Sequence, residues 1–248
     1  MQTPDLWYFE ALLFDLDGVV TDTATIHAAA WKQLFDDFLE RHAREQGGGF
    51  QPFAIETDYP RHVDGRRRYD GVAAFLRSRG IELPWGAPSD PPGTDTICAL
   101  GNAKNRRFEE QLRRHAVEVF EDTVAVIRDG RARGVKTAIV SASENCRAIL
   151  ERAGLLGCFD AAVTGVEAAE LGLRGKPAPD TFLRAAELLH IRPERAVVFE
   201  DAIAGVQAGR AGGFGLVVGV DRGGAAAALV DAGADVACAD LRQLTPNA

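Results

Sequence analysis

Short apolar runs that end in acidic or hydroxyl residues recur along the chain and predict buried strands. Three of these runs end immediately before Asp15, Ser141 and Glu200. Continuous apolar runs of this kind are typical of parallel strands that are covered on both faces of a sheet. The strands expected on this basis are 11–14, 137–140, 161–164, 197–199, 216–220 and 236–239.

Helical patterns lie between most of these runs, at 117–133, 146–153, 181–190 and 202–211. Strands that alternate with helices in this way predict an α/β fold with a doubly wound parallel sheet.

Residues 24–115 break the alternation, because they contain helical patterns but no strand run of comparable quality. Helices are expected at 25–44, 69–78 and 104–114, separated by breakers at 47–49 and by a long irregular loop within 84–101. We therefore expect a helical domain at 24–115, inserted into an α/β core formed by 1–23 and 116–248.

Composition and charge narrow the class of protein. The chain has 248 residues, of which 46% are hydrophobic and 26% charged, as in an ordinary globular protein. A net charge of -8 repels polyanions, which argues against nucleic acid as a partner. Four scattered cysteines suit reduced thiols, and no run reaches the ~18 apolar residues of a membrane-spanning helix. We expect a cytoplasmic monomer or small homo-oligomer with no membrane partner.

Polar side chains that can perform chemistry follow several of the expected strands. Asp15 and Asp17 follow the first strand, and Ser141, Lys176 and the Glu200–Asp201 pair occur near later strand ends. Each one also has a plain structural interpretation, such as a turn, a helix cap or a solvated lysine. Together they place carboxylates, a hydroxyl and a cation at one edge of one sheet, which is where α/β proteins bind ligands.

These residue types suit phosphoryl transfer. A phosphoryl group is negatively charged, so an aspartate attacks it only where a divalent cation and a lysine reduce the repulsion. Asp15 and Asp201 would hold the cation, and Mg²⁺ prefers such hard oxygen ligands. Ser141 and Lys176 would bind the other phosphoryl oxygens, while Asp17 would serve as general acid and base.

The ordered motifs resemble those of the haloacid dehalogenase superfamily, and most closely its β-phosphoglucomutase group. The matching stretches are FDLDGVVTDT with His27 and Trp31, SAS followed by Asn145, KPAPDTF, and EDAIAG. The resemblance implies a Rossmann-like core with a small α-helical cap, a phosphorylated sugar as substrate and Mg²⁺ as cofactor.

The resemblance also implies a role for each matched residue. Asp15 is the nucleophile and Asp17 the general acid and base, and the carboxylates of Asp15 and Asp201 with the main-chain carbonyl of Asp17 bind the metal. Glu200 supports the metal from nearby. The residues expected to bind substrate are Thr23, His27, Arg68, Lys104, Asn105, Ala142, Ser143 and Asn145. Two simpler interpretations stay open: His27 orients the interdomain connection, and Arg68 belongs to a solvated turn.

Two departures from the mutase pattern concern the substrate rather than the catalytic core. Glu144 stands where the mutases commonly carry a lysine, and the stretch from 82 to 103 lengthens the cap. Dehalogenation is disfavoured because Asp17 is present. A mutase that converts β-glucose 1-phosphate to glucose 6-phosphate is the first expectation, and a phosphatase acting on a small sugar phosphate is the second. A non-catalytic sugar-phosphate-binding regulator is the remote alternative.

Overall fold

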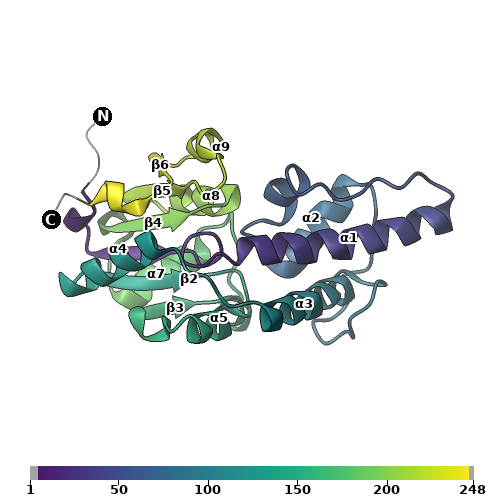
Figure 1. Cartoon of the computed structure of the whole chain (residues 1–248), viewed down its shortest axis with the longest axis horizontal. Helices are drawn as coiled ribbons and strands as arrows, with labels where there is room; N and C mark the ends of the chain where they lie inside the picture. Colours follow the sequence, from purple (N-terminus) through teal and green to yellow (C-terminus); the bar gives the residue numbers. More distant parts are fainter. Residues whose placement is uncertain (1–4, 246–248) are drawn as a thin grey trace. The chain divides into compact units, whose positions relative to one another are not determined.

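A six-stranded parallel sheet forms the centre of one of the two compact units of the protein, which we describe from a computed structural model for residues 5–245. The strand order is β3-β2-β1-β4-β5-β6, so that the first strand lies in the middle (Figure 1). The strands are β1 (Ala11–Phe14), β2 (Lys136–Val140), β3 (Ala161–Val163), β4 (Ala196–Glu200), β5 (Leu216–Val220) and β6 (Val236–Cys238). The prediction of a doubly wound α/β fold is confirmed.

Helices cover the sheet on both faces. Phe182 and Val206, from two of these helices, pack with Leu13 and Val198 of the sheet, whereas a β-carbon on Gly130 would lie 3.1 Å from the side chain of Leu12, which points to the opposite face. The helices of this part are α4 (Glu121–Ala132), α5 (Cys146–Arg152), α6 (Gly165–Glu170), α7 (Asp180–Leu189), α8 (Ile203–Ala211) and α9 (Ala226–Asp231).

The chain divides into two compact units. One contains the described residues up to Asp22 and from Val117 onward, and the other is Thr23–Ala116. The segments at which the chain leaves and re-enters the first unit lie side by side, because the Asp22 N–H donates to the Glu118 carbonyl at 3.0 Å and Thr21 forms a β-bridge with Val119. The second unit is therefore an insertion between two neighbouring segments of the first unit.

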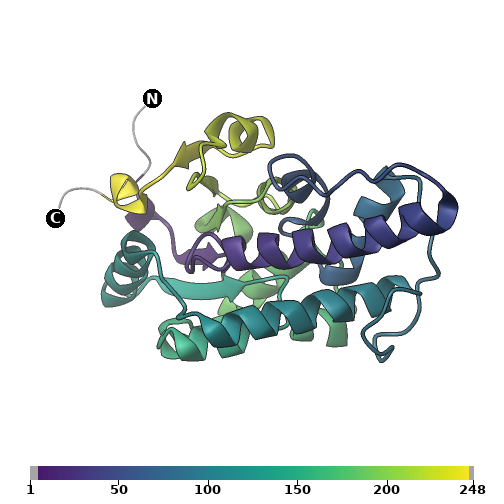
Figure 2. The ribbon, with the colours of Figure 1, turned by 45° about the vertical axis from the view of Figure 1, so that its right-hand side comes forward.

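The second unit is helical and consists mainly of α1 (Ala24–Gln46), α2 (Arg68–Ser78) and α3 (Ile97–Arg114), with a π-helical turn at Tyr59–Val63. Helices α1 and α3 lie side by side in both views (Figures 1 and 2). Three phenylalanine rings form the centre of its own core: Phe35 lies 5.2 Å from Phe53 and 4.1 Å from Phe75, measured between ring centroids.

Several element boundaries differ from the expectation. Helix α3 begins at Ile97, not at Lys104, because the Thr96 hydroxyl accepts the Ala99 N–H at 3.0 Å and caps the helix. The loop expected to continue to Gly101 therefore ends at Thr96. Helix α4 begins at Glu121, since the residues before it are extended and pair with the segment that follows β1. The short helices α6 and α9 were not expected.

Candidate functional site

Asp15 follows β1 and opens a tight turn, residues 15–21, which we call the catalytic loop because Asp15 is the candidate nucleophile. The Asp15 N–H continues the sheet by donating to the Phe199 carbonyl at 3.0 Å. The Leu16 carbonyl then accepts the N–H groups of Val20 and Thr21, each at 2.9 Å. These bonds close the loop on itself directly after the strand, so that Asp15 lies at the carboxyl edge of the sheet.

Gly18 is required in this loop for two reasons. Its φ of +89° lies in a region that side chains rarely adopt, and a β-carbon at this position would lie 1.8 Å from Oδ2 of Asp201. The carboxylate of Asp201, which follows β4, therefore lies against the backbone of the catalytic loop. The structure thus brings Asp201 next to the Asp15–Asp17 segment.

Lys176 is the buried centre of the site, with only 4% of its surface exposed. Its Nζ donates to Oδ1 of Asp15, forms an ion pair with Oε1 of Glu200 at 2.5 Å, and donates to the Val140 carbonyl at 3.1 Å. The other oxygen of Glu200 accepts the Ala202 N–H at 3.1 Å. The carboxylate of Glu200 is thus directed toward Lys176.

Burial and charge shift the pKa values of this cluster. Burial alone would lower the pKa of Lys176, but the carboxylates of Asp15 and Glu200 raise it well above its usual range. Burial raises the pKa of Asp15, partly offset by Lys176, and the negative charge of Asp17 raises it further. Burial likewise raises the pKa of Glu200 to about 8, again offset in part by Lys176. The single positive charge of Lys176 therefore cannot neutralise the carboxylates of both Asp15 and Glu200.

That excess negative charge, together with hard oxygen donors, fits a divalent cation. The described part of the chain contains no group of three or more His, Cys, Asp or Glu side chains arranged to hold a metal. Magnesium does not need such a group, because proteins usually bind it through one or two carboxylates with waters and substrate phosphate. The carboxylates of Asp15 and Asp201, which lie at this edge of the sheet, could form part of a set of this kind.

Ser141 follows β2 and begins a second turn. Its Oγ accepts the Ser143 N–H at 3.1 Å, and Oγ of Ser143 accepts the Asn145 N–H at 3.2 Å. Since a hydroxyl oxygen that accepts can still donate its proton, Ser141 retains a proton that it could donate to an anion. The backbone of Gly165 lies so close beneath this turn that a β-carbon there would be 2.6 Å from the Ala142 carbonyl.

The remaining predicted residues lie in the helical unit. Nζ of Lys104, which is buried, lies 2.5 Å from Nδ1 of His27 and 4.9 Å from the ring centroids of both Trp31 and Phe108. These contacts hold a cation between aromatic faces. The Thr23 carbonyl accepts the His27 N–H at 3.0 Å at the start of α1. The side-chain amide of Asn105 donates to Glu109 at 2.8 Å.

Arg68 is supported by residues that sequence reasoning missed. Its guanidinium donates to the Tyr69 hydroxyl at 3.2 Å, which donates to Oδ1 of Asn102 at 2.9 Å. The Asn102 amide donates to the carbonyls of Pro88 and Asp90 at 3.0 and 2.8 Å, and so ties Arg68 to the long loop. Thr96 could have revealed this support from the sequence, because threonine is a common helix cap and a helix that begins after Thr96 includes Asn102.

The part of the chain that the structure describes has no helix long and apolar enough to cross a membrane.

Comparisons with known proteins agree with the motifs. The family model of haloacid dehalogenase-like hydrolases matches residues 9–213. A β-phosphoglucomutase of Mycobacterium bovis is 47% identical over 94% of this chain and 90% of that protein. A fructose-1-phosphate phosphatase of Escherichia coli is 29% identical over 84% of this chain and 95% of its own length. A crystal structure of a β-phosphoglucomutase from Clostridium difficile covers 96% of this chain and 93% of its own, with 22% identity and a TM-score of 0.74, which shows the fold.

Proposed function

Since the chain belongs to the haloacid dehalogenase-like hydrolase family and is an enzyme of that family, we propose that it transfers a phosphoryl group through Asp15 and isomerises β-glucose 1-phosphate to glucose 6-phosphate. The observation that carries the proposal is the buried contact of Asp15 with Lys176 at the carboxyl edge of the sheet. The 47% identity to a β-phosphoglucomutase supports the choice of reaction.

Asp15 attacks the phosphorus atom of the substrate and becomes a phosphoaspartate, while the bond from phosphorus to the sugar oxygen breaks. Lys176 remains charged at neutral pH and offsets the charge of the phosphoryl oxygens. The Ser141 hydroxyl donates to one of those oxygens. Asp17 gives a proton to the leaving sugar oxygen and, in the reverse sense, takes one from the attacking hydroxyl.

Family members use a divalent metal, and we assign Mg²⁺ here to the carboxylates of Asp15 and Asp201 and the main-chain carbonyl of Asp17, with Glu200 behind them. When bound, the ion supplies positive charge at the transferring phosphoryl group. Glu200 contributes by holding Lys176 beside Asp15.

A mutase also needs a second anion site for the phosphate that is not being transferred. We assign the binding of this phosphate to Arg68, Ser143 and Asn145, with a contribution from Lys104, and we assign Asn105 to substrate binding. The supported guanidinium of Arg68 suits a bidentate contact with phosphate. His27, Thr23 and Ala142 complete the set that we assign to substrate binding.

Hydrolysis of a small sugar phosphate is the second candidate function. Glu144 and the similarity to a fructose-1-phosphate phosphatase favour it, because an acidic side chain weakens a second phosphate site. We place the protein in the cytoplasm as a monomer or small homo-oligomer that acts on a phosphorylated sugar. Its net charge of -8 argues against nucleic acid, and no membrane partner is proposed.

The deciding assay supplies purified enzyme and Mg²⁺ with α- or β-glucose 1-phosphate, with and without a glucose bisphosphate primer. Glucose 6-phosphate and free phosphate are measured separately. A mutase forms glucose 6-phosphate from the β-anomer, whereas a parent enzyme that yields only free phosphate would support the phosphatase.

Asp15→Asn is expected to abolish both products, because an amide is not a nucleophile, while circular dichroism shows an intact fold. Appreciable turnover by this variant would contradict the assignment of Asp15.

A further inference from the structure

The beginning of α4 forms hydrogen bonds with the backbone of the catalytic loop. The N–H of Phe120 donates to the Val20 carbonyl at 3.0 Å, and the hydroxyl of Thr123 donates to the Val19 carbonyl at 2.8 Å. Val19 and Val20 are two and three residues from Asp17. Contacts on these two carbonyls therefore help to fix the backbone that carries the general acid and base.

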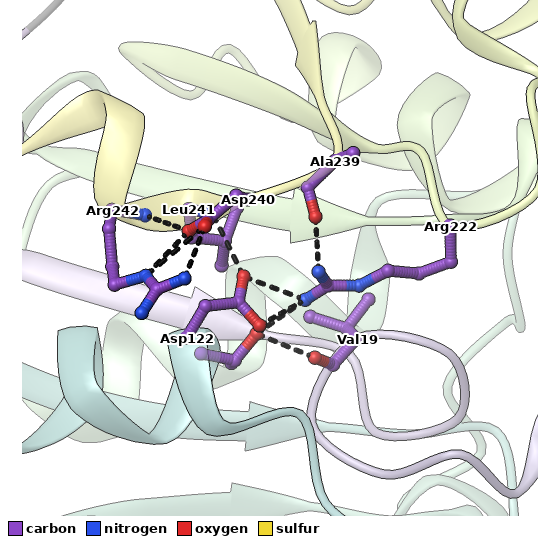
Figure 3. Close-up of polar contacts among 8 residues, drawn as sticks. Val19, Asp122, Arg222, Ala239, Asp240, Leu241 and Arg242 are labelled. Atoms are coloured by element: carbon purple, nitrogen blue, oxygen red, sulfur yellow. Dashed lines mark hydrogen bonds and ion pairs between the residues drawn. The ribbon is translucent and has the colours of Figure 1, made fainter.

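Arg222, which follows β5, lies beside this contact, with its guanidinium directed toward Asp122 (Figure 3). Its Nη2 lies 3.0 Å from both carboxylate oxygens of Asp122 and 3.0 Å from Oγ1 of Thr123. Its Nη1 donates to the Ala239 carbonyl, and its guanidinium lies 4.2 Å from the ring centroid of Phe120. The side chain thus contacts three residues at the start of α4 and one residue after β6.

The chemistry of these groups fixes the direction of the hydrogen bonds. A guanidinium can only donate, so Oγ1 of Thr123 accepts from Arg222. A hydroxyl has a single proton, and that proton is then directed to the Val19 carbonyl. Hydrogen bonds in such a chain strengthen one another, the more so because Thr123 is fully buried.

Asp122 balances the charge of Arg222. Its carboxylate is largely buried, accepts the Leu241 N–H at 2.9 Å in addition to Arg222, and lies in the first turn of α4, where negative charge is favourable. The guanidinium is therefore held by fixed partners on two sides. Through these contacts, the turn after β6 helps to support the catalytic loop near the start of the sequence.

We propose that Arg222 is a positioning residue that acts through Thr123 on the catalytic loop and so sets the placement of Asp17. The inference rests on the proposed phosphoryl transfer, and it concerns the steps in which Asp17 moves a proton. Loss of Arg222 or of the Thr123 hydroxyl loosens the Val19 carbonyl, and small displacements of a reacting group are costly, up to about 100-fold per 1 Å.

The test compares a reaction that needs Asp17 with one that does not. Transfer from a sugar phosphate requires a proton for the leaving sugar oxygen, whereas phosphorylation of Asp15 by acetyl phosphate releases acetate, which leaves as the anion. Arg222→Met and Thr123→Val should each reduce kcat for the sugar phosphate by about 10-fold with KM nearly unchanged. The rate of Asp15 phosphorylation by acetyl phosphate should remain that of the parent.

Two further variants separate positioning from packing. Thr123→Ser retains the hydroxyl and should recover most of the sugar-phosphate activity that Thr123→Val loses. The double variant of Thr123→Val with Arg222→Met should be no slower than the worse single variant, because both changes interrupt one chain of hydrogen bonds. Additive losses would overturn the proposed path through Thr123.

Arg131→Met is the matched control. Its guanidinium also contacts a carboxylate, a carbonyl and a threonine hydroxyl, namely Asp160 at 3.3 Å, Cys158 at 3.1 Å and Thr137 at 3.4 Å, beside the amino end of β2. This variant should lower Tm without changing the ratio of the two reactions. If Arg222→Met behaves in the same way, or both reactions fall equally, Arg222 is only structural.

Each outcome can be assigned to one hypothesis. If Arg222→Met does not fold, the same comparison is made with Arg222→Lys, which keeps a positive charge beside Asp122 but loses the planar guanidinium that donates to Thr123. If the parent enzyme yields only free phosphate, the mutase proposal fails. The positioning role is then measured on hydrolysis of the same sugar phosphate, which also requires Asp17.

Discussion

Replacement of Gly18 by alanine tests whether Asp201 is a metal ligand without removing its carboxylate. The new β-carbon would lie 1.8 Å from Oδ2 and 2.6 Å from Cγ of Asp201, far inside contact distance, so the carboxylate must move away. The substitution also forces a side chain into a φ of +89°. The two effects must be separated before the result says anything about the metal.

Gly134 supplies the control, because its φ is +79° and a β-carbon there would meet no atom within 4 Å. Gly134→Ala should therefore show the backbone cost alone, ~1–2 kcal/mol. Gly18→Ala should lose that amount and, in addition, bind Mg²⁺ at least ~10-fold more weakly, which corresponds to ~1.4 kcal/mol. A parent enzyme at a Mg²⁺ concentration of about 100 Kd gains ~2.7 kcal/mol of stability from the ion.

The assay is urea unfolding of the parent, Gly18→Ala and Gly134→Ala, each with and without Mg²⁺. Gly134→Ala should keep the full stabilisation by the ion, while Gly18→Ala should lose about half of it or more. Equal stabilisation of the two variants by Mg²⁺ would refute the placement of Asp201 as a ligand. Isothermal titration of Mg²⁺ into each protein gives the affinities directly.

Three further predictions concern single side chains. Asp17→Asn should still accept a phosphoryl group from acetyl phosphate but slow sugar-phosphate turnover by ~10²–10⁴-fold, and parent-like turnover would make Asp17 structural only. Arg68→Ala should reduce the rate of isomerisation by ~10-fold or more, which corresponds to ~1.5–3 kcal/mol, and leave acetyl phosphate hydrolysis unchanged. Asn102→Leu should give a smaller loss of the same kind. Equal losses on both substrates would refute the second anion site. Burial would raise the pKa of Glu167, but hydrogen bonds from Thr164 and Arg147 lower it to about 2 from a usual 4.5. The stabilising effect of the ionised carboxylate is thus present above pH 4.5 and lost as the pH falls toward 2. Glu167→Gln should therefore lower the free energy of unfolding by ~1–2 kcal/mol at pH 7 but by much less at pH 2, as measured in thermal melts. An equal difference at both pH values would contradict this.

The sheet was predictable because its strands are short and continuously apolar. A continuous apolar run such as Val197 to Phe199 is typical of a parallel strand that is covered on both faces, and the runs before Asp15 and Ser141 have the same character. Helix starts were less predictable. The residues around Thr96 contain enough Pro and Gly to indicate a loop, and only the hydroxyl bound to the Ala99 N–H shows where the loop ends.

The placement of Asp15, Ser141 and Glu200 at one edge of the sheet was predictable from the order of residues at strand ends, because parallel strands end at the same edge, whereas Lys176 lies between α6 and α7 and follows no strand directly. The mutual arrangement of these side chains was not predictable. The sequence does not show that Glu200 faces Lys176, since that depends on the backbone of Gly205, where a β-carbon would overlap the Glu200 carboxylate. Arg222 was missed because it has no motif of its own and acts through the start of α4.

The pairing of the two segments that flank the helical unit, at Thr21 and Val119, also affects how fast the protein can fold. Ala11 of β1 pairs with Lys136 of β2 and with Ala196 of β4, so the central strand finds its partners only across long stretches of chain. Such distant contacts slow folding. If the segments that flank the helical unit pair first, through Thr21 and Val119, the length of that unit is removed from the loop between β1 and β2. That shortening lowers the entropic cost of closing the loop by about 1 kcal/mol, so the early pairing of these segments favours the pairing of β1 with β2.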